Sequence, residues 1–274
     1  MPSAGSAGTD PAEARTAAAH IATDLAALGV RRGGLLLVHS SLKSLGRVPG
    51  GPETVIDGLM QAVGPAGTLL LPALSYKFVT PKSPVFDVRA TKSCVGAIPE
   101  SFRVRAGTLR SVHPTHSVAA LGGRAQDLLG DHLEDSTPVG AHSAFAKLRD
   151  LDGQLLFLGC GLEPNTSMHG VEELVEPPYL FDPPIEYRLT LADGKTINKW
   201  YRPHGFAGVI QRYDRMEELL EPDGALKAGP VLEAKAHLMD SAPMWERAAA
   251  ALRRDPWFFV DRGARASPRS FNGC

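Results

Sequence analysis

The sequence contains few cysteines and no long apolar run. Its 274 residues include three cysteines, Cys94, Cys160 and Cys274, which are scattered along the chain. An odd and scattered set argues against a disulfide framework and a cysteine-based zinc site, and it is typical of a reducing compartment. No apolar run approaches the roughly 18 residues that span a bilayer, so we expect no transmembrane helix and no membrane partner. The first ten residues lack the basic start and apolar core of a secretory signal, and the sequence predicts a cytoplasmic protein.

The chain also lacks an excess of basic charge. It has 29 Lys+Arg against 30 Asp+Glu, a formal net charge of −1, and it shows no base-stacking motif. These absences argue against a nucleic-acid partner. With 43% hydrophobic and 22% charged residues, the composition excludes wholesale disorder and a coiled coil. Acidic residues concentrate at positions 131–187, which predicts either a solvated face or a pocket for a cationic ligand.

The first part of the chain alternates helices and strands. Asp10 and Pro11 open a helix that ends at Gly29, and a second helix is expected over residues 52–63. Short apolar runs at residues 35–39 and 68–72 are typical of buried strands. This order predicts an α/β fold of three layers, α/β/α, with a mostly parallel central sheet.

The later segments extend this pattern. Residues 185–191 and 195–201 alternate around an Asp-Gly turn, which predicts a β-hairpin as a small antiparallel insertion. The loop over residues 77–90 has a length that is usually functional or mobile. We expect one domain over residues 10–262, with flexible tails at 1–9 and 263–274. Further strands are expected at 116–121 and 155–160, and further helices at 95–105, 141–148, 206–219, 230–239 and 244–252.

A histidine and a glutamate lie three residues apart after one of the predicted strands. Asn165 or Thr166 can cap a helix whose first turns carry His169 and Glu172. Positions three apart share a helix face, and a carboxylate beside an imidazole orients it and raises its basicity, as a general base requires. Loops after parallel strands are also where α/β active sites form. The same pattern fits a capping or core histidine, so the spacing alone leaves both interpretations open.

Two other polar segments carry weaker signals. Residues 39–54 join a strand to a helix through a Gly-Gly turn whose backbone N–H groups can bind an anion, but they contain no Walker A or GxGxxG motif. His113 and His116 are three apart and can bind a metal, yet no HExxH motif accompanies them and Pro114 breaks any helix. A tight turn and a polar junction entering a strand are the favoured interpretations.

The sequence offers no convincing nucleophile. It has no Gly-x-Ser-x-Gly elbow, which argues against an α/β-hydrolase. Cys160 lies inside an expected apolar strand and is interpreted as a buried, inert thiol.

Four segments in order resemble the aminoglycoside N3-acetyltransferase family, which is unrelated to the GNAT fold. The resemblance covers the chain from about Leu28 to about Arg254. It rests on Val-His-Ser-Ser-Leu with the Gly-Gly-Pro-Glu-Thr-Val turn at 38–55, Arg-Ser-Val-His-Pro-Thr-His-Ser at 110–117, Thr-Pro-Val-Gly-Ala-His-Ser at 137–143, and Asn-Thr-Ser-Met-His with Glu at 165–172. Two positions depart from the family pattern: Ser167-Met168 replaces its usual Thr-Leu, and Ala144 stands where a proline is common.

The resemblance implies direct acetyl transfer from acetyl-CoA to an amine, without a covalent acyl-enzyme and without a metal. His169 is then the general base and Glu172 its partner. Donors near Ser40 and Ser41 or at Thr166 can stabilise the oxyanion of the tetrahedral intermediate, and Thr166 is the preferred side-chain candidate. The residues that the resemblance places along CoA are His39, Ser40, Ser41, Leu42, Gly46, Gly51, Arg110, His113, Thr115 and Ser117.

The acceptor implied by the family is the 3-amino group of an aminoglycoside. The acidic centre of the chain fits such a polycation. From this charge we expect the acceptor to contact Asp135, Glu173, Asp182 and Glu186, and we expect the loop from Tyr76 to Asp87 to close over it, with Tyr76 in contact.

Three alternatives stay open. The chain can acetylate a different amine in biosynthesis, it can be a catalytically silent CoA- or sugar-binding homologue, or His169 can activate water in a thioester hydrolase. The intact pairing of His169 with Glu172 argues against the silent homologue. We expect a monomer or a homodimer.

Overall fold

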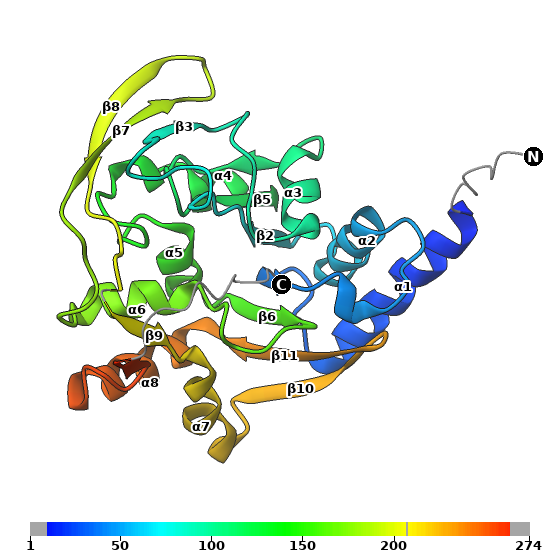
Figure 1. The fold of residues 1–274 in the computed structure, drawn as a ribbon. Helices are drawn as coiled ribbons and strands as arrows, with labels where there is room; N and C mark the ends of the chain where they lie inside the picture. Colours follow the sequence, from blue (N-terminus) through cyan, green and yellow to red (C-terminus); the bar gives the residue numbers. More distant parts are fainter. Residues whose placement is uncertain (1–9, 207, 264–274) are drawn as a thin grey trace, which may run out of the picture.

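The computed structural model describes residues 10–206 and 208–263, so the two expected tails, apart from Gly263, lie outside the described part of the chain. A central sheet of seven strands organises the fold (Figure 1). In spatial order it contains β10 (Leu226–Val231), β11 (Ala234–Asp240), β6 (Gln154–Leu158), β1 (Leu35–Ser40), β2 (Thr68–Pro72), β5 (Val118–Gly122) and β4 (Leu109–Arg110).

Parallel pairing occupies the middle of this sheet. β1 pairs in parallel with β6 and with β2, whereas β11, β10, β5 and β4 join by antiparallel pairing. Five of the seven strands described in this sheet therefore point the same way, and only β5 and β11 run against them. The predicted mostly parallel sheet is confirmed in strand direction, and its antiparallel contacts lie outside the β6-β1-β2 centre.

Helices cover both faces of the sheet, which confirms the three-layer α/β/α prediction. One core joins alternate residues of the central strands to α1 (Pro11–Leu28), α2 (Pro52–Val63) and α3 (Ala97–Val104). A second core joins the intervening residues to α4 (Ala125–Leu129), α5 (Ala144–Asp150), α6 (Ser167–Val175), α7 (Met216–Leu220) and α8 (Ser241–Arg254). The near-continuous apolar runs of β1, β2 and β6 follow from burial on both faces.

Local sequence signals explain both ends of α1. The Asp10 side chain accepts a hydrogen bond from the Ala12 N–H at 2.8 Å, and Gly29 ends α1 in the left-handed region at φ 108°. Gly170 lets α6 approach α8 closely, because a Cβ at this position would lie 2.1 Å from the ring of Trp245. α6 is thereby held against α8 by one face.

Two small sheets flank the central one. The predicted hairpin is confirmed as β7 (Ile185–Thr190) and β8 (Thr196–Tyr201), and β3 (Val85–Asp87) pairs in parallel with β7. This sheet encloses a separate core that includes Phe86 and Tyr201, and in Figure 1 it lies at the end of the molecule away from α1. The other sheet joins β9 (Val209–Gln211) to β12 (Val260–Arg262). Short 3-10 helices occur at Lys43–Leu45, His132–Glu134, Tyr213–Arg215 and Glu221–Asp223.

Two helix predictions are wrong. Residues 230–239 form the end of β10, a turn at Leu232 with φ 51°, and most of β11, in which Lys235 is exposed between buried alanines. That alternation has a strand period, which the helical interpretation overlooked. Of residues 206–219, only the last turns are helical, because residues 209–211 pair with a strand near residue 260 that is distant in sequence.

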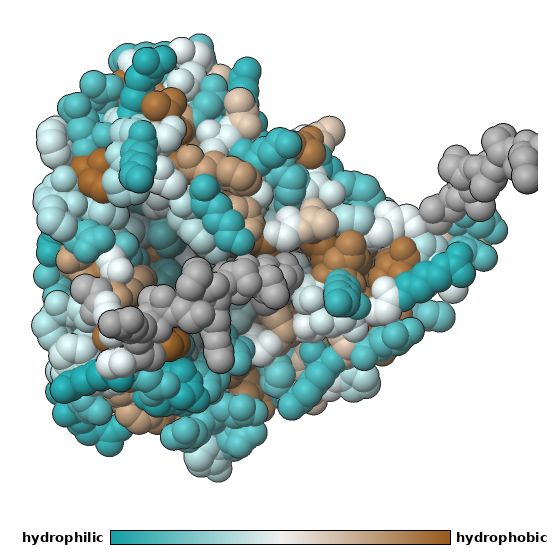
Figure 2. Space-filling view, in the orientation of Figure 1, coloured by the Kyte–Doolittle hydropathy of each residue, from teal (hydrophilic) through white to brown (hydrophobic). Residues whose placement is uncertain are grey.

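The surface carries hydrophobic residues in small separate groups. Figure 2 shows them among hydrophilic residues on the face drawn there. Scattered apolar residues of this kind are ordinary on folded domains. Within residues 10–206 and 208–263, no helix is both long and apolar enough to cross a membrane.

Candidate active site

A cavity of about 560 Å³ opens at the carboxyl ends of the three parallel strands. Its wall includes residues 38–41 at the carboxyl end of β1, Pro72, Leu74 and Tyr76 at and beyond the end of β2, and residues 159–161 and 163–164 after β6. His116, His169, His204 and Tyr213 also line it, together with Val95, Pro99, Thr166, Phe206 and Gln211. Loops at this edge of a parallel sheet are the usual place for ligands in α/β folds, and the volume is that of a small-molecule site.

α6 brings His169 to the cavity wall. Asn165, rather than Thr166, caps this helix, since its side-chain oxygen accepts from the Ser167 N–H at 3.2 Å. The His169 side chain is 12% exposed and Glu172 is fully buried behind it. The distance between His169 Nδ1 and Glu172 Oε2 is 3.4 Å, which is long for a direct hydrogen bond.

Tyr213 bridges the histidine and the carboxylate. Its hydroxyl lies 2.9 Å from His169 Nδ1 and donates to Glu172 Oε2 at 2.7 Å. Because the single hydroxyl proton goes to Glu172, His169 Nδ1 must donate to the tyrosine oxygen, so the neutral ring carries its proton on Nδ1. Nε2 is then free to accept a proton, as a general base requires.

Burial keeps the two tyrosines beside Glu172 protonated. Burial, followed by the charge of Glu172, raises the pKa of Tyr213 well above its ordinary value, so the phenol stays protonated. Tyr179 donates to the other oxygen of Glu172 at 3.1 Å, and burial raises its pKa as well. The Glu172 carboxylate therefore accepts from two tyrosines while fully enclosed.

Two further histidines surround His169. The ring centroids of His116 and His204 lie 5.4 Å and 5.0 Å from that of His169. Burial lowers the pKa of both rings well below the ordinary value, so they are neutral at pH 7. His204 Nε2 lies 2.8 Å from Glu173 Oε1, and burial raises the pKa of Glu173 to about 7. The lowered pKa of His204 and the raised pKa of Glu173 both favour an uncharged pair, in which the imidazole is neutral and the carboxyl group is protonated.

His39 forms the floor of the cavity next to β6. Its ring stacks on Phe157 with centroids 5.0 Å apart. Burial, followed by the charge of His169, lowers the pKa of His39 to about 3. We therefore assign His39 a neutral ring that shapes the cavity and takes up no proton near pH 7.

The predicted site residues divide into two groups. Those that line the cavity are His39, Ser40, Ser41, Tyr76, Thr166 and His169, and Glu172 and Glu173 contact histidines of its wall from behind. Outside the described lining lie Leu42, Gly46, Gly51, Arg110, His113, Thr115, Ser117, Asp135, Asp182 and Glu186.

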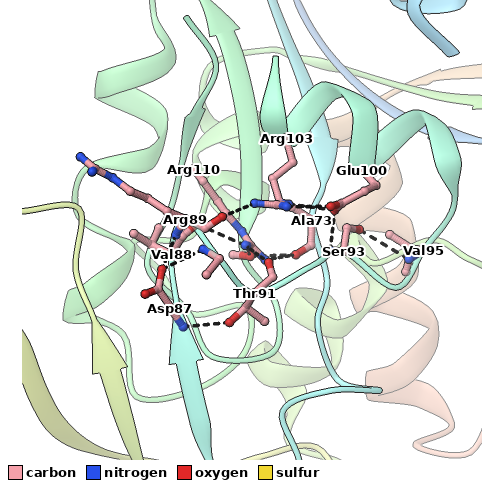
Figure 3. Close-up of polar contacts among 12 residues, drawn as sticks. Ala73, Asp87, Val88, Arg89, Thr91, Ser93, Val95, Glu100, Arg103 and Arg110 are labelled. Carbon is pink, nitrogen blue, oxygen red and sulfur yellow. Dashed lines mark hydrogen bonds and ion pairs between the residues drawn. The ribbon is translucent and has the colours of Figure 1, made fainter. Parts of the chain in front are cut away.

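Arg110, expected along CoA, instead fastens the loop that precedes α3 (Figure 3). Its guanidinium donates to the backbone oxygens of Val88, Thr91 and Ala73 and to the Ser117 hydroxyl. Burial lowers its pKa to about 9, so it remains charged at neutral pH.

A second guanidinium holds the same loop. Arg103 binds both oxygens of Glu100 and donates to the Arg89 carbonyl, while the Ser93 N–H donates to Glu100 at 2.7 Å (Figure 3). Residues 87–93 are thus tied down from two sides. This arrangement argues against the predicted mobile closure at this end of the loop.

Other predicted contacts have structural partners too. His113 Nδ1 accepts from the backbone N–H groups of Thr115 and His116, and its ring stacks on His132 with centroids 5.1 Å apart. The Thr115 hydroxyl lies 2.8 Å from His116 Nδ1, so it orients a cavity histidine. Gly46 faces Glu233, whose carboxylate would lie 2.2 Å from a Cβ added there.

Three of the four predicted acidic contacts lie outside the described lining of the cavity. Asp135 is buried and accepts from His142 Nδ1 at 2.9 Å. Asp182 packs against Gly205, and Glu186 is exposed on β7. The described lining contains a single carboxylate, Glu163, which the sequence analysis did not select.

Three other lining residues were missed or misjudged. Tyr213 fell inside the helix predicted over residues 206–219, of which the structure keeps only the last turns, beginning with a 3-10 helix at Tyr213. His204 follows the hairpin without a motif to mark it. The interpretation of Cys160 as a residue of a buried strand is wrong, because β6 ends at Leu158 and Cys160 lies in the cavity wall. The signal available in the sequence was its place just after a strand end, where α/β sites form.

Comparisons with known proteins agree with this architecture. Residues 37–253 match the family model described as aminoglycoside 3-N-acetyltransferase. The chain is 33% identical over 233 residues to the aminoglycoside N(3)-acetyltransferase IV of a Salmonella species, covering 85% of this chain and 86% of that protein.

Solved structures show the same fold. The AAC-IIIb binary complex with CoASH aligns with a TM-score of 0.75 at 29% identity, covering 85% of this chain and 95% of that one. A histidine-to-alanine variant of aminoglycoside acetyltransferase AAC(3)-IVa in complex with a gentamicin aligns with a TM-score of 0.75 at 32% identity, covering 88% and 90%. The family model matches most of the chain, and the alignment with a relative of 33% identity covers most of both proteins. The chain therefore belongs to the aminoglycoside 3-N-acetyltransferase family of acyltransferases.

Proposed function

We propose that this protein transfers the acetyl group of acetyl-CoA to the 3-amino group of an aminoglycoside. The observation that carries the proposal is the relay from His169 through Tyr213 to Glu172 at the wall of the cavity. The names of its relatives, the CoASH complex of one structural neighbour and the gentamicin complex of another support the two substrates.

In the proposed reaction, His169 Nε2 removes the proton that the acceptor ammonium must lose before its nitrogen can attack. The amine forms a bond to the thioester carbonyl carbon, and the tetrahedral intermediate collapses as the carbon–sulfur bond breaks. The proton held on His169 passes to the departing CoA thiolate, and the nitrogen releases its second proton to solvent as the amide forms. The acetyl group moves directly to the amine, so no acyl-enzyme forms.

The relay stabilises the charged form of His169 during the step. When Nε2 takes the proton, the imidazolium donates through Nδ1 to Tyr213, and Tyr213 donates to the buried Glu172 carboxylate. Charge-assisted hydrogen bonds in an enclosed site are stronger than neutral ones. Glu172 thus balances the positive charge without taking the proton itself.

Thr166 is the proposed donor to the oxyanion. It lines the cavity three residues before His169, and its hydroxyl makes only a 3.4 Å contact with the Pro164 carbonyl. A contact of that length is easily exchanged for a shorter bond to a developing negative charge. Ser40 and Ser41 are the serines of the same cavity that can contact pantetheine oxygens.

The test is thiol release from acetyl-CoA with wild type and His169→Ala, using aminoglycosides whose 3-amino group is free or blocked. We expect turnover only with the free 3-amino group and a loss of about 10²–10⁴-fold in kcat for His169→Ala. His20→Ala, an exposed histidine of α1, is the matched control. Unchanged turnover in His169→Ala would refute the assigned base, and thiol release without any amine would indicate a hydrolase.

One observation favours a second candidate, acetylation of a less highly charged amine. The described cavity lining contains one carboxylate, Glu163, whereas a polycationic antibiotic is best matched by several. Turnover of simple amines with no turnover of aminoglycosides in the same panel would select this candidate and keep the chemistry.

A further inference from the structure

The histidines around the proposed base form a cluster with metal-ligating geometry. One ring nitrogen from each of His116, His169 and His204 lies within 4.8 Å of the others. The three rings come from separate parts of the fold: the segment before β5, helix α6, and the loop after β8. Tertiary packing therefore brings together three imidazoles, which is the ligand set of several zinc sites.

Each ring of the cluster has one nitrogen already engaged. Thr115 Oγ1 lies 2.8 Å from His116 Nδ1, Tyr213 OH lies 2.9 Å from His169 Nδ1, and Glu173 Oε1 lies 2.8 Å from His204 Nε2. A metal-binding histidine almost always uses its second nitrogen in this way, with a carboxylate, carbonyl or other partner that fixes ring and tautomer. The opposite nitrogens remain for a ligand, and His204 Nδ1 is buried with no hydrogen-bond partner among the described residues.

The environment favours the form of histidine that binds metals. Burial lowers the pKa of His116 and of His204, so both are neutral near pH 7, and the neutral ring is the ligand form. Ligand nitrogens of a tetrahedral zinc site are about 3.3 Å apart, as follows from zinc–nitrogen distances of about 2.0–2.1 Å. The ring nitrogens, which lie within 4.8 Å of one another, would have to move closer by ring rotation to share one ion, and the cavity leaves room for a fourth ligand.

We propose that His116, His169 and His204 bind a divalent transition-metal ion of the Zn²⁺ class, and that this ion inhibits the enzyme. The bound ion would occupy Nε2 of His169, the atom that must accept the proton of the acceptor amine. The fourth position, facing the cavity, would be filled by water. Metal binding would thus inactivate the same pocket reversibly. The binding of the metal itself does not depend on which amine the enzyme acetylates.

Calorimetry tests the site without any turnover. Zn²⁺ is titrated into the tag-free, chelator-treated chain, and Co²⁺ is titrated in parallel with its visible ligand-field absorption as the readout. We expect one saturable equivalent and a Co²⁺ spectrum typical of four- or five-coordination. His204→Ala and His116→Asn should each weaken the affinity at least about tenfold, because even partners that only orient a ligand contribute about 10–100-fold. His20→Ala should bind as wild type does.

A second experiment measures inhibition of acetyl transfer by the metal. Zn²⁺ should suppress acetyl transfer by wild type, EDTA should restore it, and the acceptor amine should protect against it. Absence of saturable binding to wild type, or equal affinity in wild type, His204→Ala and His116→Asn, would overturn the site. Binding to a chain that acetylates no aminoglycoside would leave the metal site standing and refute only the proposed function.

Discussion

At the scale of single residues, the site depends on one hydroxyl. Tyr213 lies between His169 and Glu172. The direct distance of 3.4 Å between His169 Nδ1 and Glu172 Oε2 is too long to orient the imidazole ring well. The spacing of three residues placed the histidine and the carboxylate on one helix face, as predicted. Their communication, however, requires a side chain that lies about 40 residues further along the chain.

Tyr213→Phe should therefore damage catalysis more than binding. The change removes the acceptor of the His169 Nδ1 proton and one of the two hydroxyl donors to Glu172, so we expect kcat to fall about 10–100-fold, part of the contribution of a general base. The acidic limb of the kcat–pH profile should also move, since the basicity of His169 depends on its partner. Steady-state kinetics across pH measures both effects.

Tyr179→Phe is the matched control for this experiment. Tyr179 also donates to Glu172, at 3.1 Å, but it binds Oε1, whereas Tyr213 and His169 both approach Oε2. The Tyr179 variant should lower stability without moving the pH profile as far. Equal profiles for the two variants would contradict a specific relay through Tyr213 and leave only a role in solvating Glu172.

At the scale of elements, the loop before α3 is fixed by buried guanidinium groups. Arg110 satisfies three backbone oxygens and a hydroxyl at once, and Arg103 with Glu100 holds the next residues (Figure 3). This loop carries Val95 into the cavity wall, so its rigidity shapes the site. The length of the loop suggested a mobile lid, but the structure shows that residues 87–93 are held in place by hydrogen bonds.

Arg110→Lys should loosen this loop although it keeps the charge. A lysine cannot reproduce the planar fork, so buried carbonyls lose their donors, each at a cost of about 1–3 kcal/mol that is partly relieved by water. We expect the free energy of unfolding to fall by about 2–4 kcal/mol and amide exchange to rise over residues 87–93. Urea unfolding and hydrogen exchange measure these changes, with the exposed Arg89→Lys as control. Unchanged exchange in this loop would show that Arg103 alone holds it.

At the scale of the whole molecule, the fold buries an unusual set of neutral histidines. Burial lowers the pKa of His39 to about 3 and of His132 to about 4, and lowers those of His113, His116 and His204 well below the ordinary value. In the unfolded chain these rings take up protons as the pH falls through about 6.5, whereas in the folded chain they stay neutral. Acid therefore favours unfolding.

The predicted consequence is a loss of stability below about pH 6.5 that continues toward the folded-state pKa values. Each of these rings contributes up to about 1.4 kcal/mol per pH unit in that window. Glu173, whose pKa is raised to about 7, acts in the opposite sense between about pH 4.5 and 7 and offsets one of them. Urea unfolding at pH 7.5, 6.5 and 5.5 should show the midpoint falling with acidification.

A variant can isolate one of these groups. His132→Gln should reduce the pH slope by about one proton, because it removes a ring that charges only on unfolding. If the urea midpoint of the wild type stayed constant from pH 7.5 to 5.5, the result would contradict the burial of these histidines in the neutral form.

The sequence by itself determined the layered fold, the parallel centre of the sheet and the helix that carries His169 and Glu172. These features arise from local causes: apolar runs for strands buried on both faces, Asp10 and Gly29 at the ends of α1, and a three-residue spacing on one helix face. The resemblance to a known family added the predicted reaction, because the motifs of that family are contiguous segments that can be recognised in the sequence. Strand β9 was misread because pairing with the distant β12 overrode the local pattern, whereas the strand-period alternation within β11 was overlooked.

Only the tertiary structure decided which polar residues meet in the cavity. Tyr213 and His204 reach His169 through packing between segments far apart in the chain, and no local period encodes that contact. Charge counting placed Asp135, Asp182 and Glu186 near a cation, but a one-dimensional count shows neither the pairing of buried Asp135 with His142 nor the exposure of Glu186 on β7. Arg110 was selected by motif, and its four hydrogen-bonding partners become visible only when three loops are brought together.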